Sequence, residues 1–255
     1  MLELDKQDIH LWLAREPDAS SPQLWQSYLE LLSERELARY ERLAKDEMKR
    51  QFVLTQVLAR SVLAKYLGNA PPESLRFQRN AHGKPYLDTD GAPQFNLTNS
   101  HGLVVLAVAA EAEVGVDVEY IRRDVPFLKL ARRWFTPDEA ASFDGLAGED
   151  LRQHFFDYWT LKEGWLKGYG TGLKTPLATF SIKLQPDSIK VDFDEKLGEI
   201  PEHWSFWQFD VAGDFRLSLC ARDHKVRKDR VMVREGLPLE GFRELSLVQR
   251  RPVLR

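Results

Sequence analysis

Two long helical segments, each followed by a pair of strands, constrain the fold of this 255-residue chain most strongly. Segment 50–68 aligns without a gap with segment 152–170 when the sequence is shifted by 102 residues. The identical pairs are Arg50/Arg152, Gln51/Gln153, Lys65/Lys167 and Gly68/Gly170. These matches are few, so the repeated order of helix, short mixed strand and strongly apolar strand is the better support. The pattern predicts an α+β protein built from two similar subdomains, at residues 1–113 and 114–255.

The composition is typical of an ordered globular protein, with 43% hydrophobic and 29% charged residues. A formal net charge of −3 gives no reason to expect nucleic acid or an anionic membrane as a partner. The longest apolar run, 103–110, is too short to cross a bilayer, and the first residues lack the pattern of a signal peptide. The single Cys220 cannot form an internal disulfide, and its apolar neighbours predict a buried strand residue. We therefore expect a soluble, cytoplasmic protein.

The strand-like segment 114–121 carries two carboxylates among apolar residues. Asp117 and Glu119 are two positions apart, so on a strand both side chains point to the same face. Two like charges on one face repel, and their burial is costly unless a cation or hydrogen bonds compensate. Carboxylate oxygens suit a hard cation such as Mg²⁺ or Mn²⁺ better than zinc. An Asp-x-Glu pair is common, so its meaning depends on what the rest of the chain adds.

A third carboxylate lies in the second long helix, which we expect at about residues 149–167. Glu163 and Lys167 are four positions apart and share one helix face, where Trp159 precedes Glu163 by one turn. Taken alone, a solvated surface ion pair is the simpler interpretation. Joined to Asp117 and Glu119, Glu163 would complete a three-carboxylate Mg²⁺ site with positions open for phosphate oxygens and water.

Four short motifs follow one another along the chain: Gly83-Lys84-Pro85-Tyr86, Phe95-Asn96-Leu97-Thr98, Gly115-Val116-Asp117-Val118-Glu119, and Trp159-Thr160-Leu161-Lys162-Glu163 with Lys167. In order, spacing and chain length they resemble the signatures of the 4′-phosphopantetheinyl transferases of the large, Sfp-like type. The resemblance implies two α/β subdomains related by pseudo-twofold symmetry, with the active site at their junction. It further implies a monomer that uses Mg²⁺, or Mn²⁺, to move the phosphopantetheine arm of coenzyme A onto a serine of an apo acyl or peptidyl carrier protein. A non-catalytic module that binds coenzyme A or a carrier protein on the same fold is the alternative.

The resemblance also implies roles for individual residues. Asp117, Glu119 and Glu163 would hold the metal against the pyrophosphate. Glu163 would remove the proton of the incoming serine, and Lys167 would neutralise the leaving phosphate, so that Glu163, Lys167 and Asp117 carry the catalysis. The implied coenzyme A contacts are Lys84, Thr98, Asn99, His101 and Lys162, with Arg39, Arg50 and Arg60 as further phosphate contacts. Lys84 as a plain turn lysine and Lys162 as a surface residue are the alternatives.

One position departs from the family pattern. The family usually has a histidine after Phe-Asn-x-Ser/Thr, and that histidine contacts the 3′-phosphate of coenzyme A. This chain has Asn99 there, with His101 two residues later. Because Asn can donate a hydrogen bond but brings no charge, either His101 replaces that histidine or coenzyme A binds somewhat differently. His101 as an ordinary turn residue is a third interpretation.

The end of the chain is basic, from His224 through Arg230 to Arg251. One interpretation is a docking element for acidic carrier proteins. The other is a solvated, mobile tail, which the position at the chain terminus favours.

Overall fold

A computed structural model describes residues 2–16, 21–222 and 229–250 of the chain. The first half comprises β1 (Ile9–Arg15), α1 (Pro22–Glu30), α2 (Glu34–Arg42), α3 (Asp46–Tyr66), β2 (Phe77–Arg79), β3 (Pro85–Leu87), β4 (Gln94–Ser100) and β5 (Leu103–Ala109). The second half comprises β6 (Glu113–Tyr120), α4 (Phe127–Trp134), α5 (Pro137–Ala141), α6 (Gly148–Tyr169), β7 (Phe180–Gln185), β8 (Ser188–Phe193), β9 (Trp204–Val211), β10 (Phe215–Arg222), β11 (Val231–Leu237) and β12 (Gly241–Leu245). Short 3₁₀ helices lie at Pro72–Ser74, Gly172–Lys174, Leu177–Thr179, Glu195–Leu197 and Pro201–His203. No helix within these described ranges is long and apolar enough to cross a membrane.

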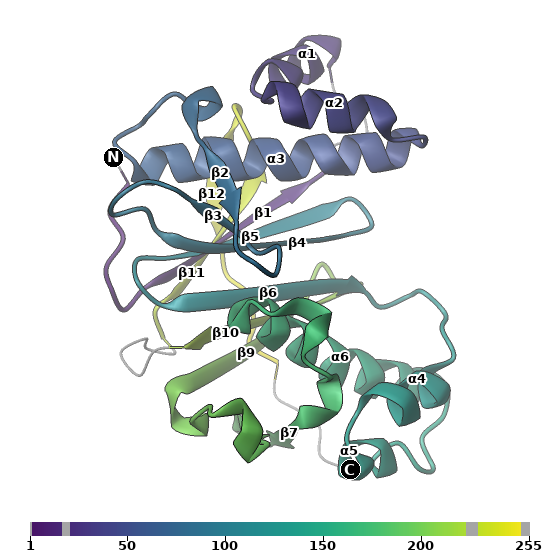
Figure 1. Cartoon of the computed structure of the whole chain (residues 1–255). Coiled ribbons are helices and arrows are strands. Elements are labelled where there is room, and N and C mark those ends of the chain that lie inside the picture. Colours follow the sequence, from purple (N-terminus) through teal and green to yellow (C-terminus); the bar gives the residue numbers. More distant parts are fainter. Residues whose placement is uncertain (1, 17–20, 223–228, 251–255) are drawn as a thin grey trace.

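Four layers stack in the order α3, first sheet, second sheet and α6 (Figure 1). The first sheet has the strand order β12-β11-β1-β5-β4, and the second has the order β6-β10-β9. The facing sides of the two sheets share one core, which contains Leu11 and Val105 from the first and Val116 and Leu217 from the second. The long helices cover the outer faces, because each presents an apolar stripe to its sheet.

The connectivity of the two halves repeats. In each half a long helix leads into a small hairpin, β2–β3 or β7–β8, and then into two paired strands. The antiparallel order β1-β5-β4 of the first half recurs as β6-β10-β9 in the second. The α+β class is confirmed, and the repeat supports the two-part organisation read from the sequence. The twofold relation and the division between residues 113 and 114 stay predictions.

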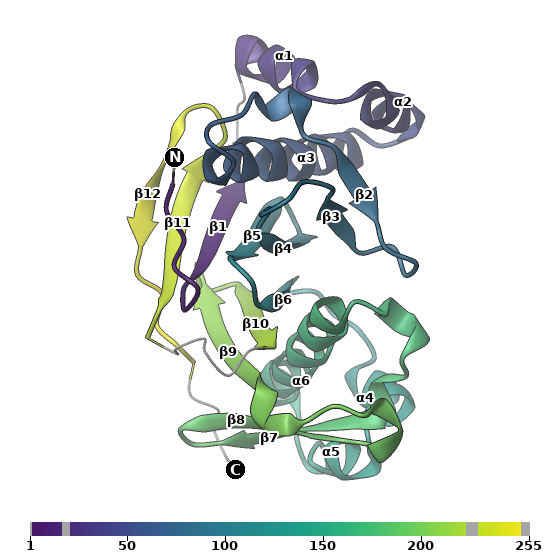
Figure 2. The same ribbon diagram turned by 60° about the vertical axis from the view of Figure 1, so that its left-hand side comes forward.

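The interpretation of the C-terminal region as a solvated, mobile tail is wrong for residues 231–250. Strand β11 pairs in parallel with β1, with Val231 opposite Ile9, and β12 pairs with β11 (Figure 2). Val233 is buried in the core between the sheets, and this apolar inner face explains why the segment returns to the first sheet. Residues 224–228 and Arg251 lie outside the described residues, so the docking interpretation stays a prediction.

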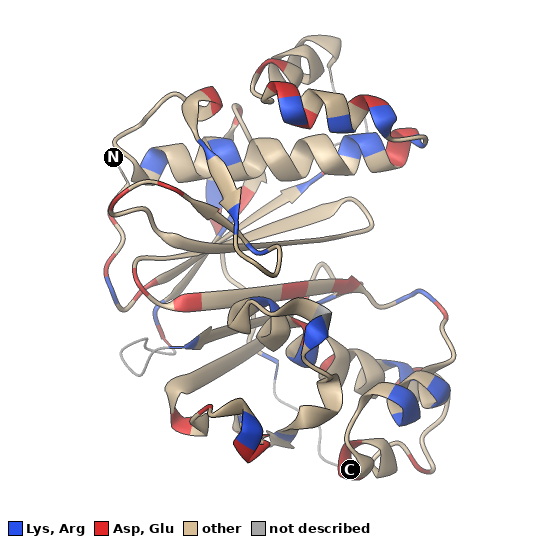
Figure 3. Cartoon of the chain, in the orientation of Figure 1, with Lys and Arg blue, Asp and Glu red and all other residues tan. Residues whose placement is uncertain are grey.

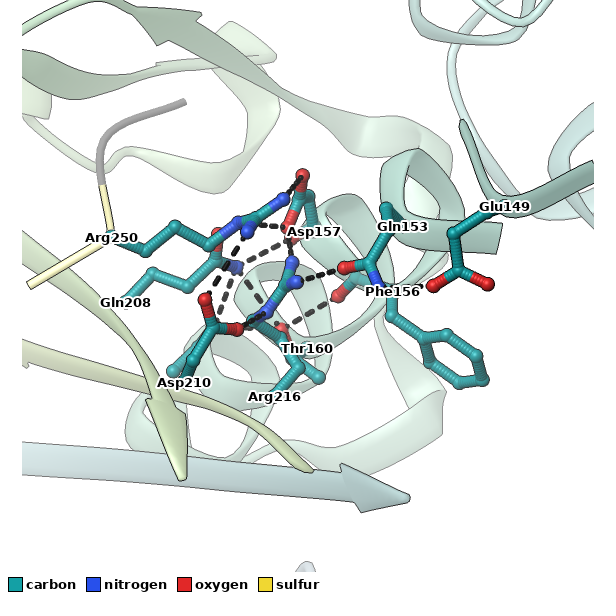
Figure 4. A network of polar contacts seen from close by, with 10 residues as sticks. Glu149, Gln153, Phe156, Asp157, Thr160, Gln208, Asp210, Arg216 and Arg250 are labelled. Atoms are coloured by element: carbon teal, nitrogen blue, oxygen red, sulfur yellow. Dashed lines mark hydrogen bonds and ion pairs between the residues drawn. The ribbon is translucent and has the colours of Figure 1, made fainter. Parts of the chain in front are cut away.

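Arg250 fastens the end of the described chain to α6 (Figure 4). Its Nε donates to Asp157 Oδ1 on α6 at 3.0 Å, and its Nη1 donates to Asp210 Oδ2 on β9 at 3.2 Å. The fully buried Arg216 of β10 contacts the same two carboxylates. Two guanidinium groups and two carboxylates thus compensate one another, which is the condition for keeping such charges in a protein interior.

We expect Arg250→Ala to lower the free energy of unfolding by about 2 kcal/mol, because it removes charge-assisted hydrogen bonds to a buried carboxylate. Urea denaturation followed by circular dichroism measures this change. Arg243→Ala is the matched control: Arg243 is 81% exposed and pairs with Glu235 at 3.4 Å, so its loss changes stability by less than about 0.5 kcal/mol. Equal stability of the two variants would contradict the assigned role of Arg250.

Candidate active site

The two sheets are joined at their edges by side chains of β4 rather than by a backbone ladder. Asn96 Oδ1 accepts a hydrogen bond from the Val116 amide at 3.0 Å. Thr98 Oγ1 accepts one from the Val118 amide at 3.3 Å, and Ser100 Oγ accepts one from the Tyr120 amide at 3.2 Å. The three acceptors alternate along β4 and therefore face β6 together. We call this contact the β4–β6 ladder; it satisfies edge amides of β6 that would otherwise be buried without partners.

Helix α6 lies unusually close to β6, because glycines meet at the contact. A Cβ atom on Gly115 would lie 2.1 Å from the carbonyl oxygen of Gly164 and 2.3 Å from the amide nitrogen of Gly168. Only a residue without a side chain fits there. The glycine of the third motif therefore sets the distance between the strand that carries Asp117 and the helix that carries Glu163.

This approach brings the predicted acidic residues together in one cleft of about 440 Å³. The cleft is lined by Leu97, Thr98, Asn99, Asp117, Val118, Glu119, Trp159, Glu163 and Lys167. Lys167 Nζ donates to Asp117 Oδ1 at 2.6 Å and to Thr98 Oγ1 at 2.9 Å. Figure 3 shows that β6, which lies next to α6, carries acidic positions along its length. The structure thus joins Asp117, Glu119, Glu163 and Lys167, as the sequence predicts.

Glu119 is held by three donors that the sequence analysis did not identify. Ser100 Oγ donates to Glu119 Oε2 at 3.2 Å, while Trp159 Nε1 and Arg123 Nη2 donate to Oε1 at 3.1 and 2.8 Å. The sequence does carry a signal for Ser100, since Asn96, Thr98 and Ser100 alternate with period two. Arg123 lies in the turn after β6 and carries no comparable local signal.

Burial and mutual repulsion disfavour the charged form of all three carboxyl groups. Burial raises the pKa of Asp117, which Lys167 opposes. Burial and the neighbouring Asp117 raise the pKa of Glu119. Burial, followed by the charge of Asp117, raises the pKa of Glu163 to about 7. A divalent cation would relieve this repulsion.

The donor chemistry of the cleft fits a hard divalent cation. The candidate ligands are carboxylate oxygens only, and Asp117 Oδ2 is buried without a hydrogen-bond partner among the described residues. As the side chains lie, however, no three His, Cys, Asp or Glu residues in the described part of the chain already converge as a metal site. In this arrangement the Lys167 ammonium group, rather than a metal ion, neutralises Asp117. Ligation by Asp117, Glu119 and Glu163 would require these side chains to turn toward a common point.

Two predicted coenzyme A contacts lie in the interior instead of in the cleft. Lys162 is fully buried, and its Nζ donates hydrogen bonds to Glu139 Oε1 at 2.8 Å and to the Phe180 carbonyl oxygen at 2.6 Å. It is therefore neither a phosphate contact nor a surface residue. It neighbours Glu163 in sequence, and adjacent residues on a helix point in different directions. Arg60 is likewise buried and pairs with Glu36 at 2.7 Å.

Two further predicted contacts also lie away from the cleft. Lys84 Nζ donates to the carbonyl oxygens of Gly168 and Val114, so it is not a plain turn lysine. The guanidinium of Arg39 lies over the ring of Phe52, 5.1 Å from its centroid. Neither residue lines the cleft that contains Asp117.

Asn99 and His101 lie beside different cavities. Asn99 lines the 440 Å³ cleft and donates to Thr55 Oγ1 at 3.3 Å. His101 occupies the β4–β5 turn with a φ of 45°, where its ring stacks on Tyr120 at 4.5 Å, and it lines a second cavity of about 940 Å³. The charged residues of this second cavity are Arg15, Glu16, Asp46, Glu47, Lys49 and Arg50.

Comparison with known proteins shows which family this chain belongs to. Residues 113–220 match the 4′-phosphopantetheinyl transferase superfamily, and residues 18–113 match the N-terminal region of 4′-phosphopantetheinyl transferases. The 4′-phosphopantetheinyl transferase HetI of Nostoc sp. is 36% identical over 189 residues, which cover 72% of this chain and 78% of HetI. The chain belongs to the 4′-phosphopantetheinyl transferase superfamily.

Other relatives agree with this membership. The 4′-phosphopantetheinyl transferase Sfp of Bacillus subtilis is 26% identical over 71% of this chain and 78% of its own length. A solved structure of a holo-(acyl-carrier-protein) synthase from Bacillus anthracis aligns with 43% of this chain and with 93% of the synthase chain. The sequence identity is 16% and the TM-score is 0.34, so this similarity is too weak to support an argument. The family predicted from the four motifs is confirmed, and with it the transferase function.

In this phosphopantetheinyl transferase we expect Gly115→Ala to lower the free energy of unfolding by about 3 kcal/mol, because the added methyl group overlaps the backbone of α6. Gly164→Ala is the matched control on the other side of the contact. Its Cβ would lie 3.6 Å or more from its nearest neighbours, and alanine is the better helix former. Chemical denaturation of both variants checks the assignment, which a Gly115→Ala protein as stable as the parent would contradict.

Proposed function

We propose that this transferase uses Mg²⁺ to move the 4′-phosphopantetheine arm of coenzyme A onto a serine of an apo acyl or peptidyl carrier protein. The observation that carries the proposal is the single cleft in which Asp117 and Glu119 of β6 face Glu163 and Lys167 of α6. Family membership supports the reaction, and the oxygen-only donor set supports the metal. The lining of the cleft also favours a monomer, because β4 of the first half and β6 and α6 of the second half of one chain all contribute residues to it.

The reaction breaks a pyrophosphate linkage, so negative charge grows on phosphate oxygens in the transition state. A bound Mg²⁺, held by Asp117, Glu119 and Glu163, would supply charge neutralisation there. Lys167 neutralises charge on the departing phosphate, from a position 2.6 Å from Asp117 in the free protein. Glu163 accepts the proton of the serine hydroxyl, directly or through a water molecule, as the hydroxyl oxygen attacks the phosphorus. The products are the holo carrier and adenosine 3′,5′-bisphosphate.

The nucleotide end of coenzyme A fits the 940 Å³ cavity in this proposal. Arg15, Lys49 and Arg50 supply positive charge there, and His101 lines the same space. The Arg50 guanidinium pairs with Glu16 in the free protein, so phosphate would compete with that carboxylate. These residues replace Lys84, Arg39 and Arg60 as the proposed 3′-phosphate contacts.

The transfer is tested by incubating the protein with coenzyme A, Mg²⁺ and an apo carrier, and by measuring the mass of the carrier. We expect the addition of one phosphopantetheine group. Glu163→Gln and Asp117→Asn should each lower kcat/KM roughly 100- to 1,000-fold, because transition-state charge loses its preorganised partners. Glu195→Gln, at an exposed site on the Glu195–Leu197 turn, is the matched control and should behave as the parent protein does.

Metal dependence has a separate readout. Chelation should stop transfer, added Mg²⁺ should restore it, and calorimetry should detect Mg²⁺ binding in the parent protein but not in Asp117→Asn. Coenzyme A binding without transfer to any of a panel of carriers would instead indicate the non-catalytic binding module. Full activity of the Asp117→Asn protein would overturn the site assignment.

A further inference from the structure

The hairpin β2–β3 reaches from the first half of the molecule to the end of α6 in the second half (Figure 2). Lys84 Nζ donates to the Gly168 carbonyl at 2.8 Å and to the Val114 carbonyl at 3.3 Å. Asn80 Nδ2 donates to the Gly170 carbonyl at 3.3 Å. One ammonium group therefore bridges the last turn of α6 and the beginning of β6.

The end of α6 requires such donors. The carbonyl groups in the last turn of a helix have no partner within the helix, and the partial negative charge at this end favours a cation. Gly170 ends α6 in the left-handed conformation, with a φ of 81°, and a Cβ there would lie 3.3 Å from Lys84 Cδ. The hairpin thus caps this helix from a segment that is 84 positions away in sequence.

The turn geometry places Lys84 for this contact. Asn80 Oδ1 accepts hydrogen bonds from the amides of His82 and Lys84, both at 2.9 Å, while its Nδ2 reaches Gly170. Lys84 is half-buried in this arrangement, and this burial lowers the pKa of its ammonium group. Of the two cavities described above, neither is lined by Lys84.

We propose that Lys84, together with Asn80, is a positioning residue that fixes the end of α6 against β6 and so holds Lys167 at Asp117. Gly168 directly follows Lys167, and Val114 precedes Asp117 by three residues, so both ends of the bridge lie next to the reacting groups. The proposal rests on the transferase function proposed above and replaces the expectation that Lys84 contacts the 3′-phosphate.

The kinetic test compares Lys84→Met with the parent protein, using coenzyme A and 3′-dephospho-coenzyme A as substrates. A positioning role predicts a kcat that is roughly 10- to 100-fold lower for both substrates, with little change in KM, because a displaced α6 misplaces Lys167. Lys84→Arg keeps a cationic donor and should restore part of the lost kcat. A phosphate contact predicts the opposite: a higher KM for coenzyme A and a loss of its preference over the dephospho form, with kcat kept.

Arg50→Met and Lys190→Met serve as reference variants. Arg50 lines the 940 Å³ cavity, so its loss should raise the KM for coenzyme A and reduce the preference over the dephospho form. Lys190 is exposed on β8, and its loss should change neither constant. A Lys84→Met protein that behaves as Arg50→Met or as Lys190→Met would overturn the positioning role.

Hydrogen exchange gives a readout that does not depend on transferase activity. In Lys84→Met the amides of residues 166–170 should exchange faster, while the first turns of α6 keep their protection. Asn80→Asp is the second variant: it keeps the oxygen that accepts from residues 82 and 84 but removes the donor to Gly170, and it should show the same local change. Unchanged exchange in both variants would overturn the proposal even if transfer is active. An inactive parent protein with the predicted exchange pattern would overturn the proposed function alone.

Discussion

The β4–β6 ladder is the interaction on which the rest of the structure depends. It joins two sheets at their edges by letting Asn96, Thr98 and Ser100 accept the amides of β6. Two of these acceptors also contact the acidic residues, since Thr98 donates to Asp117 and Ser100 donates to Glu119. The Thr98 hydroxyl makes all three hydrogen bonds available to it: it donates to Asp117 and accepts from the Val118 amide and from Lys167 Nζ. The side chains that join the halves are therefore the ones that orient the carboxylates.

A cluster of partly buried carboxylates costs free energy, and the surrounding structure offsets this cost by holding α6 at several places. The glycine contact at Gly115 fixes its distance from β6, Arg216 and Arg250 hold it at Asp157, and the Lys84 bridge holds its end. These contacts leave little freedom for the helix that carries Glu163 and Lys167. Rigid placement of charged groups is what electrostatic catalysis of phosphoryl transfer requires.

Local patterns in the sequence predict the elements and the centre of the site. The spacing of apolar residues predicts the ends of both long helices to within a few residues. The two-residue spacing of Asp117 and Glu119 on a strand, and the four-residue spacing of Glu163 and Lys167 on a helix, predict that each pair shares one face. Contacts between residues that are distant in sequence were not predicted, because no local pattern identifies the partner. Arg60 pairs with Glu36 across 24 positions, and Lys84 contacts Gly168 across 84. The return of β11 to the first sheet was missed for the same reason.

The central claim is that the carboxylates of β6 and α6 bind one metal ion against the pyrophosphate of coenzyme A. Anomalous diffraction from crystals grown with coenzyme A and Mn²⁺ tests this claim most directly. The account predicts one anomalous peak within coordination distance of Asp117, Glu119 and Glu163, with pyrophosphate oxygens completing the shell and Lys167 moved from Asp117 to phosphate. Coenzyme A bound with its pyrophosphate outside the 440 Å³ cleft, or Mn²⁺ bound at other residues, would contradict it.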